Sequence, residues 1–335
     1  MEITFLGTSA AVPTRERNLP SIALLYNGDQ ILFDAGEDVQ RRFEDLGLKF
    51  NAPLSIFISH MHGDHVIGLP GLLFRFTLIG RTTDVIIFGP PGLFSYLYLH
   101  RLVTGLRAPF LHEVYEIYLE EKLLRKYDFQ GSSDQKPEEI PIKKNTLYDT
   151  SDYFVDAFPV CHSIITYGFR FQEKPRPGKF YPMIAKKLKI PRGHLWKEMQ
   201  MGKTINYKGK SYNPEELGII GPKRQGIIIA YSADTMLCEK LHPLANNADV
   251  FICEATYGNE LKDLAEEKKH MTALQCAEIA RDSNVGQLIL THISSRYTDE
   301  NILLKEAQFI FPNTVIAHDM LRLTTTKNRI LKLSQ

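Results

Sequence analysis

The chain has 335 residues, of which 44% are hydrophobic and 24% are charged. This composition excludes a disordered chain and allows a large buried core in one or two domains. Acidic and basic residues nearly balance, with a formal net charge of +1, so the overall charge does not by itself predict a polyanionic partner.

The first residues contain neither a basic segment nor a long apolar run, so no signal peptide is expected. No stretch approaches the roughly 18 uncharged apolar residues of a membrane-spanning helix, so no membrane association is expected. The four cysteines are scattered without a C-x-x-C pair, which argues against a disulfide scaffold or a cysteine-type zinc finger. We therefore expect a cytoplasmic protein.

The first hundred residues alternate short apolar runs with turns. Strands are predicted at residues 3–6, 22–25, 31–33, 54–58 and 85–88. The sequence Asn27-Gly28-Asp29 predicts a hairpin turn between the second and third of these. Apolar residues at helical spacing predict helices over 37–46, over 66–79 and after Pro90-Pro91.

The remaining chain continues this alternation with one interruption. The polar, lysine-rich stretch 120–150 predicts a loop, and residues 173–210 break the pattern. Strands are predicted at residues 154–160, 169–171, 227–231, 250–253, 288–290 and 315–317, and an amphipathic helix at 270–280. Many strands with interspersed helices and no internal repeat predict an α/β protein with mixed sheets.

Four residues of metal-ligand type crowd into six positions directly after a predicted strand: His60, His62, Asp64 and His65. Imidazole and carboxylate groups suit zinc, and also manganese or iron. Four such groups on so short a loop cannot all reach one small ion, so the loop predicts two neighbouring ions. His60 and His62 alternate along an extended segment and point the same way, while Asp64 and His65 follow a turn at Gly63. The alternative is an incidental surface cluster.

Three further ligand candidates follow later predicted strands: His162, Asp234 and His292. A single histidine after a strand is usually a hydrogen-bonded structural residue. The shared placement of all three at strand ends favours the metal interpretation. Seven ligands with one shared carboxylate would serve two four-coordinate ions and leave a bridging position to water.

The metal loop and the later ligands resemble the metallo-β-lactamase superfamily. Accessory motifs narrow the resemblance to ribonuclease Z, a family of endonucleases that trim the 3′ end of precursor tRNA. These motifs occupy residues 5–18, 32–40, 222–226, 234–235, 254–257, 270–272 and 291–297. The chain departs from the family pattern at Ala233, Cys253 and Met271, none of which is a ligand position.

The resemblance implies a four-layer αββα sandwich as a single domain over residues 1–335, with a projecting basic arm inserted at 173–210. It implies one metal held by His60, His62, His162 and Asp234, and another held by Asp64, His65, Asp234 and His292. The expected cofactor is two Zn²⁺ per subunit, with Mn²⁺ or another divalent ion as the alternative. The family also suggests a homodimer in which the arm of one subunit serves the site of the other.

Further site residues are expected around the two ions. Asp64 would lie beside the bridging water and is the candidate general base or orienting group. His270 resembles the family residue that protonates the departing 3′-oxygen or stabilises the transition state; the alternative is a histidine at a helix start with no catalytic task. Asp34 and Glu254 are expected to fix imidazole tautomers, and Asp34 could equally stabilise a turn. His318 is expected to be structural.

The segment 173–210 contains eleven lysines and arginines against two glutamates, a net charge of +9 in a chain of +1. Such concentrated charge is typical of surfaces that bind phosphate backbones, although a solvated basic loop is the alternative. The run 190–196 followed by Gly202-Lys203 resembles the substrate-binding arm of the family, with Gly193-His194 in place of its usual Gly-Pro. The expected RNA-binding residues are Lys186, Lys187, Lys189, Arg192, Lys197 and Lys203.

The resemblance, together with the basic arm, implies a zinc-dependent endoribonuclease that removes the 3′ trailer of precursor tRNA and leaves a 3′-hydroxyl on the tRNA. One alternative is a hydrolase of the same superfamily that acts on a small phosphodiester or thioester, which would have no use for the basic arm. Another is a non-catalytic binding protein with the same fold. Against that alternative, all seven ligand positions are occupied.

Overall fold

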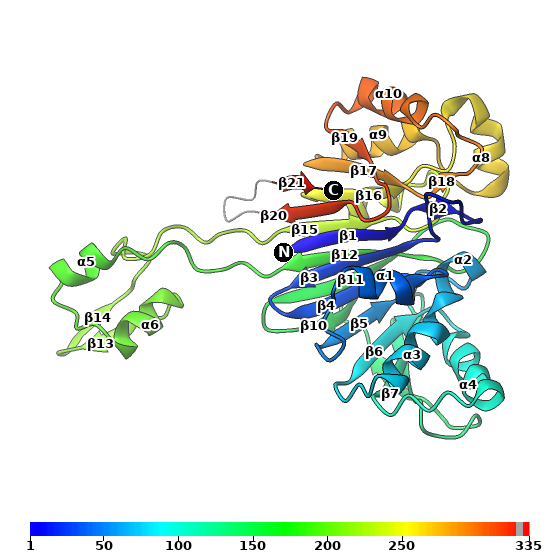
Figure 1. Cartoon of the computed structure of the whole chain (residues 1–335). Coiled ribbons are helices and arrows are strands. Elements are labelled where there is room, and N and C mark those ends of the chain that lie inside the picture. The colour runs from blue at the N-terminus through cyan, green and yellow to red at the C-terminus, as the bar shows by residue number, and fades with distance from the viewer. Residues whose placement is uncertain (326–330, 335) are drawn as a thin grey trace. The chain divides into compact units, whose positions relative to one another are not determined.

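The computed structural model describes residues 1–325 and 331–334 (Figure 1). By its internal contacts the chain divides into two units. The first comprises Met1–Asp149, Val155–Phe171 and Ile228–Gln335, and the second comprises Thr150–Phe154 and Gln172–Ile227.

Ten strands of the described residues form a mixed sheet. In spatial order they are β21 (Leu331–Ser334), β20 (Arg322–Thr325), β1 (Glu2–Gly7), β3 (Ser21–Tyr26), β4 (Asp29–Phe33), β5 (Leu54–Phe57), β6 (Val85–Gly89), β7 (Leu111–Tyr118), β8 (Leu123–Asp128) and β9 (Glu138–Pro141). The strands from β4 to β7 are parallel and therefore need crossover connections. The helices α1 (Val39–Asp45), α3 (Gly68–Leu78) and α4 (Leu93–Thr104) lie in these connections, and their apolar sides share a core with the sheet.

The turn between β3 and β4 is the predicted hairpin. Tyr26 pairs with Asp29 across the antiparallel strands. Asn27 and Gly28 between them have φ values of 52° and 100°, the left-handed conformation that a two-residue hairpin loop requires. The prediction at this turn is confirmed.

Seven strands of the described residues form a second sheet. In spatial order they are β10 (Thr146–Asp149), β11 (Tyr153–Pro159), β12 (Tyr167–Glu173), β15 (Ile228–Tyr231), β16 (Val250–Glu254), β17 (Gln287–Thr291) and β19 (Thr314–Ile316). The last four are parallel. The helices α7 (Leu241–Ala245), α9 (Ala273–Asp282) and α10 (Asn301–Ile310) share a second core with this sheet. Before α9 come the 3₁₀ turn η1 (Asn259–Leu261) and α8 (Lys262–Lys268).

Aromatic side chains join the two sheets face to face. The ring of Phe169 on β12 lies 5.8 Å from Phe33 on β4 and 5.6 Å from Phe57 on β5, measured between ring centroids. Tyr26 and Phe171 make a third such contact at 5.4 Å. With helices packed on each sheet, the first unit is the predicted four-layer αββα sandwich (Figure 1).

Parallel strands bring sequence-distant residues to one edge of the sandwich. The strands β15, β16 and β17 run in the same direction, so the residues that follow them gather at their common carboxyl end. Left-handed backbone at Ala233 (φ 53°) and His292 (φ 57°) turns the chain sharply there. Near this edge, β2 (Ser9–Ala10) pairs in parallel with β18 (Ile293–Ser294).

The prediction of a loop over 120–150 was wrong, because β8, β9 and β10 lie within it. Most of their side chains are partly buried or exposed, and charged residues interrupt the apolar alternation that marks a strand. Ion pairs between neighbouring strands replace it: Lys126 Nζ lies 2.7 Å from Glu138 and 3.3 Å from Glu113, and Arg125 Nε lies 3.2 Å from Glu139.

Two predicted boundaries also need correction. The helix expected at 270–280 begins at Ala273, where Thr272 and Gln275 form a reciprocal capping box, so His270 precedes the helix. The strand series expected to end at 315–317 continues with β20, which pairs with β1, and β21. Among the described residues, no helix has the length and apolar character needed to cross a bilayer.

The second unit has a small core of its own. It contains α5 (Pro182–Lys187), α6 (His194–Gln200) and a hairpin of β13 (Ile205–Tyr207) and β14 (Lys210–Tyr212). Trp196 is buried, its indole N–H donates to the Ile190 carbonyl at 3.0 Å, and its ring lies 5.4 Å from that of Phe180. The basic segment is therefore folded around an apolar centre, with Lys186 and Lys187 on α5 and Lys197 on α6.

Candidate metal centre

The His-rich segment follows β5 and runs into α2 (Gly63–Val66). His60 and His62 lie in the extended stretch before the helix, whereas Asp64 and His65 lie within its single turn. Because the backbone changes from extended to helical at Gly63, the side chains of the two pairs point in different directions. His60 and His65 are fully buried, so neither is a surface histidine.

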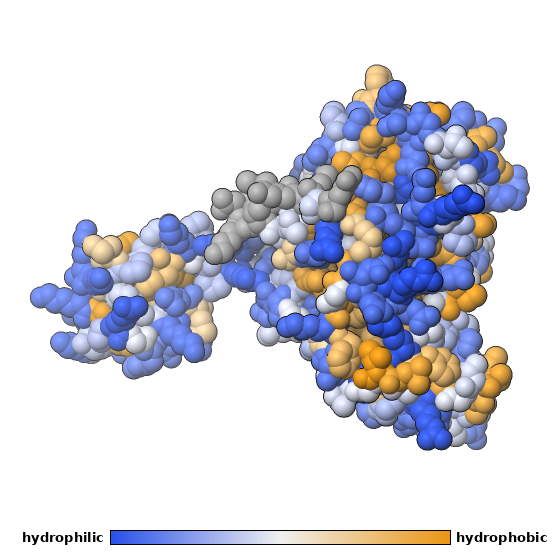
Figure 2. All heavy atoms as spheres, in the orientation of Figure 1, coloured by the Kyte–Doolittle hydropathy of each residue, from blue (hydrophilic) through white to orange (hydrophobic). Residues whose placement is uncertain are grey.

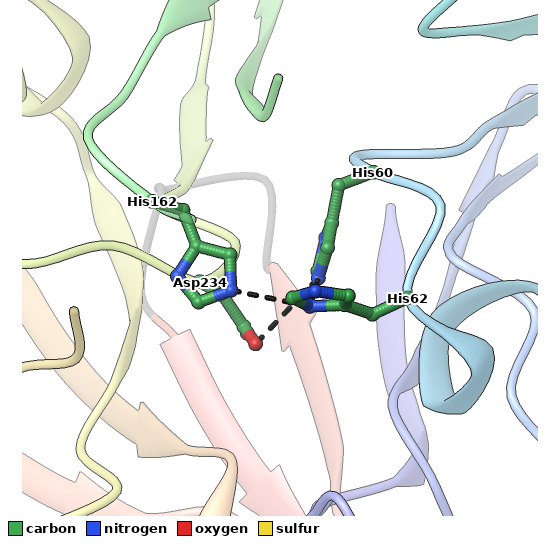
Figure 3. A group of neighbouring side chains, drawn as sticks. All are labelled: His60, His62, His162 and Asp234. Carbon is green, nitrogen blue, oxygen red and sulfur yellow. Dashed lines mark hydrogen bonds and ion pairs between the residues drawn. The ribbon is translucent and has the colours of Figure 1, made fainter. Parts of the chain in front are cut away.

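The first group of donor atoms belongs to His60, His62, His162 and Asp234, whose side chains point toward a common centre (Figure 3). His62 Nδ1 lies 3.1 Å from His60 Nε2 and 3.2 Å from His162 Nε2. Asp234 Oδ2 lies 3.7 Å from His60 Nε2.

The second group belongs to Asp64, His65, Asp234 and His292. Asp234 Oδ1 lies 3.3 Å from His65 Nε2 and 3.4 Å from His292 Nε2. Asp64 Oδ2 lies 3.6 Å and 3.5 Å from the same two nitrogens. The two carboxylate oxygens of Asp234 thus face different groups, and all seven predicted ligands lie in the two groups.

The donor atoms fit divalent metal ions. Ligand atoms about 2.1 Å from a tetrahedral zinc ion lie roughly 3.4 Å from one another, close to the separations found in both groups. In the described part of the chain, His65 Nε2, His292 Nε2 and Asp234 Oδ1 are buried without a hydrogen-bond partner. Leaving three such atoms unpaired is costly unless a cation satisfies them.

Asp34 organises the first side of the site. Its buried carboxylate accepts hydrogen bonds from the Ser59 amide (2.7 Å), the Ser59 hydroxyl (2.9 Å), the Tyr231 hydroxyl (2.8 Å) and His65 Nδ1 (2.8 Å). Because the Ser59 hydroxyl donates to Asp34, it accepts from His60 Nδ1 at 2.9 Å. Both histidines therefore carry their proton on Nδ1, which leaves Nε2 with a free electron pair toward the donor groups.

Glu254 orients an imidazole ring on the opposite side of the site, as Asp34 does on the first side. Its carboxylate accepts from the Thr256 hydroxyl at 2.8 Å, so that hydroxyl in turn accepts from His292 Nδ1 at 2.8 Å. His162 Nδ1 donates to the Lys269 carbonyl at 2.9 Å. These bonds again leave Nε2 of His292 and of His162 unprotonated.

His270 belongs to neither of the two donor groups, but its ring lies next to a histidine ring of each. Its ring lies 5.1 Å from that of His162 and 5.5 Å from that of His292, between centroids. His270 Nδ1 donates to Glu254 at 2.8 Å. Although burial opposes the charge, the Glu254 carboxylate raises the pKa of His270 to about 9, so the ring is protonated near neutral pH.

The electrostatics differ among the histidines of the two donor groups. Although burial opposes the charge, the carboxylates of Asp234 and Asp34 raise the pKa of His65 well above its ordinary value. Burial lowers the pKa of His60 well below its ordinary value and lowers the pKa of His162, so both rings stay neutral. Although burial opposes the charge, the neighbouring imidazoles of His292 and His65 hold the pKa of Asp64 below its ordinary value. Asp234 is likewise held ionised, against burial, by His292, His65 and His60.

Some residues that support the site were not predicted from the sequence. Ser59, Thr256 and Tyr231 each bond a ligand or the carboxylate that orients one. Only their positions beside predicted ligands and strand ends could have indicated them. His318, expected to be structural, lies outside the donor groups found among the described residues.

Comparison with known proteins identifies related families. The family model for the anti-Pycsar protein Apyc1 matches residues 1–173. Ribonuclease Z from Synechococcus sp. (strain CC9902) is 36% identical over 332 residues, covering 96% of this chain and 97% of that protein. Ribonuclease Z from Methanosarcina acetivorans is 33% identical over 324 residues, covering 96% and 97%.

Two solved structures share the fold. The short form of human tRNase Z superposes with a TM-score of 0.64 at 24% identity, covering 97% of this chain and 99% of that one. The metallo-β-lactamase fold protein YhfI from Bacillus subtilis gives 0.62 at 16% identity, covering 96% and 97%. Fold and donor groups together define a metal-dependent hydrolase of the metallo-β-lactamase fold.

Within that class, the relatives in sequence identify the family. Because they exceed 30% identity over nearly their whole length, the chain belongs to the ribonuclease Z family, and its residues 1–173 also belong to the family described as anti-Pycsar protein Apyc1.

Proposed function

We propose that this chain removes the 3′ trailer of precursor tRNA by hydrolysing one phosphodiester, leaving a 3′-hydroxyl on the tRNA and a 5′-phosphate on the trailer. It is a metal-dependent endoribonuclease of the ribonuclease Z family. The observation that carries the proposal is the pair of donor groups that share Asp234, in a chain 36% identical to a ribonuclease Z over 96% of its length.

Two Zn²⁺ ions are the proposed cofactor, with Mn²⁺ as the alternative. His60, His62 and His162 with one oxygen of Asp234 would hold the first ion; Asp64, His65 and His292 with the other oxygen would hold the second. Nitrogen and carboxylate donors without cysteine suit both metals. Two bound divalent ions would lower the pKa of a water between them and neutralise charge on the phosphodiester oxygens.

Asp64 is the proposed orienting group for the attacking water. Its Oδ2 accepts a hydrogen bond from the Ala11 amide at 3.0 Å, which fixes the carboxylate on the side of His65 and His292. Since its pKa is held low, the carboxylate stays ionised and can accept a hydrogen bond from the water.

His270 is the proposed proton donor to the departing 3′-oxygen. Its Nδ1 is engaged by Glu254, so Nε2 is the nitrogen that can donate. Glu254 also accepts from the Thr235 amide at 2.9 Å, which holds the carboxylate in place. A protonated imidazole beside both donor groups suits the general acid of a phosphodiester cleavage.

The arm at residues 173–210 is the proposed tRNA-binding element. Its six candidate cations are all exposed: Lys186, Lys187, Lys189, Arg192, Lys197 and Lys203. Three of them lie on helices, Lys186 and Lys187 on α5 and Lys197 on α6, and the apolar centre formed by Ala185, Ile190 and Trp196 fixes these helices. Folded RNA is bound chiefly by shape and phosphate contacts, which an ordered cationic surface can supply.

A homodimer is the proposed assembly, with the arm of one subunit serving the site of the other. The helices α3 and α4 expose large apolar side chains, namely Leu78 (83% exposed), Leu99 (59%), Leu102 (64%) and Val103 (75%). Figure 2 shows hydrophobic atoms gathered over this region. Contiguous apolar surface of this kind is typical of a protein interface.

The alternative function is hydrolysis of a small phosphodiester or thioester. One observation favours it: the family model for the anti-Pycsar protein Apyc1 covers the metal loop and ends at residue 173, where the basic arm begins. The first half of the chain therefore does not by itself specify an RNA substrate. The arm distinguishes the two functions.

The test compares substrates. With divalent metal supplied, kcat/KM is measured for a 3′-extended tRNA transcript, for bis(p-nitrophenyl) phosphate and for a simple thioester. We expect the transcript to exceed both small substrates by several orders of magnitude, because only it engages the arm. A higher kcat/KM for either small substrate would reject the proposal in favour of the alternative.

A further inference from the structure

A cavity of about 580 Å³ lies in the first unit directly beside the candidate metal centre. Four segments form it: Pro91 before α4, residues 118–121 at the end of β7 and in the turn after it, residues within 159–167 from the end of β11 to the start of β12, and Lys240 before α7. His162 belongs to its wall. One ligand side chain therefore borders both the cavity and the first donor group.

The walls of the cavity are largely apolar. Ile164 and Ile165 follow His162 closely and remain 39% and 56% exposed. Opposite elements contribute Tyr118 and Tyr167, whose hydroxyls donate to Glu116 at 3.1 Å and to the Ile117 carbonyl at 2.7 Å. These hydrogen bonds fix both rings, so the cavity is formed in advance of any ligand.

The rim of the cavity carries opposite charges. Lys240, Glu120 and Glu121 lie around it, and Glu121 is paired with Arg125 at 2.9 Å. Mixed charge does not favour a second phosphate. Apolar walls with hydrogen-bonding groups at the rim instead suit a flat, neutral ring with polar edges. The volume of the cavity falls within the range of roughly 300–1,000 Å³ that is typical of small-ligand sites.

We propose that this cavity receives the unstacked base of a nucleotide flanking the scissile phosphodiester. The inference rests on the proposed function. A single-stranded end presents bases that proteins hold between apolar or aromatic side chains. A base next to the cleaved bond is the part of the RNA that a cavity sharing a wall with the metal centre would meet. The carboxylate of Glu120 can accept from an exocyclic amino group at the rim.

The first test leaves the protein unchanged. The wild-type protein cleaves a 3′-extended tRNA transcript and two versions of it that are abasic on the 5′ or on the 3′ side of the cleaved bond. We expect one abasic site to raise KM by about tenfold, the loss typical of an emptied apolar pocket. Unchanged KM for both abasic transcripts overturns the inference. Failure to cleave the intact transcript would instead reject the proposed function.

The second test uses Ile165→Ala, with Ile302→Ala as the matched control. Ile302 on α10 is 54% exposed, close to the 56% of Ile165, and lies outside the cavity. Ile165→Ala should raise KM for the intact transcript by about tenfold and add little to the effect of the abasic site, because both changes remove the same interaction. Ile302→Ala should behave as wild type. Fully additive effects of Ile165→Ala and the abasic site would overturn the inference.

Discussion

At the scale of single residues, hydrogen bonds on the far side of each ring decide which nitrogen faces the metal centre. Asp34 and Glu254 each anchor a short chain of donors that ends on ligand histidines. His62 differs, because its Nδ1 faces the other two imidazoles of its group. Such outer contacts typically contribute about 10–100-fold to metal affinity or activity.

His270 provides the sharpest prediction at this scale. His270→Ala should lower kcat for the precursor transcript by about 10²–10⁴-fold, because the ribose 3′-oxygen needs a proton as it leaves. Hydrolysis of bis(p-nitrophenyl) phosphate should fall by less than about tenfold, since p-nitrophenolate leaves as a stable anion. Single-turnover kinetics on both substrates measure the difference.

The control for this variant is His112→Ala, a histidine whose side chain is 56% exposed on β7. It should leave both rates unchanged. Equal losses on the two substrates in His270→Ala would mean that His270 supports the site structurally instead of donating a proton.

The sequence predicted the candidate ligands and the supporting carboxylates Asp34 and Glu254, but not the hydroxyl groups that connect them. Ligand types at His60, His62, Asp64 and His65 are visible because metal chemistry demands them within six positions. Ser59, Thr256 and Tyr231 are common residues whose role arises only when strand ends from both sheets meet. No local sequence pattern predicts which of these residues come together in the folded chain.

At the scale of elements, our proposal assigns substrate binding to the arm and chemistry to the sandwich. Its core shares no residue with the cores of the sandwich, so its removal leaves the donor groups intact. Deleting residues 175–208 should abolish cleavage of precursor tRNA and spare hydrolysis of a small phosphodiester. Loss of both activities would refute this division.

A milder variant tests the charge itself. Replacing Lys186, Lys187 and Lys189 by Gln should raise KM for the transcript, because fewer RNA phosphates are neutralised. The log–log dependence of binding on salt should become shallower by roughly 0.7–0.9 for each phosphate that the variant no longer neutralises.

The sequence did not predict the strands that are rich in charged residues. Apolar strands such as β5 and β16 were predicted to within a residue or two. The strands β8 and β9 were missed because cross-strand ion pairs, and not apolar alternation, stabilise them. The charge of residues 173–210 predicted an inserted arm, but the helices and the apolar core of this segment were not predicted.

At the scale of the whole molecule, the exposed side of α3 and α4 predicts self-association. Leu99 and Val103 lie one turn apart on α4, so the double variant Leu99→Glu, Val103→Glu places two charges on one face. We expect a dimer for the wild-type protein and a monomer for the variant in sedimentation equilibrium. Phe309→Glu, on α10 and 86% exposed, should remain dimeric. A monomeric wild-type protein would contradict the assembly.

The central claim is that metal ions held by seven side chains cleave precursor tRNA at its 3′ end. The direct measurement is incubation of the protein with a 3′-extended tRNA transcript, with and without a chelator, followed by mapping of both new ends. We predict chelator-sensitive cleavage that leaves a 3′-hydroxyl on the tRNA and a 5′-phosphate on the trailer. Cleavage that resists the chelator, or no cleavage when divalent metal is supplied, would contradict it.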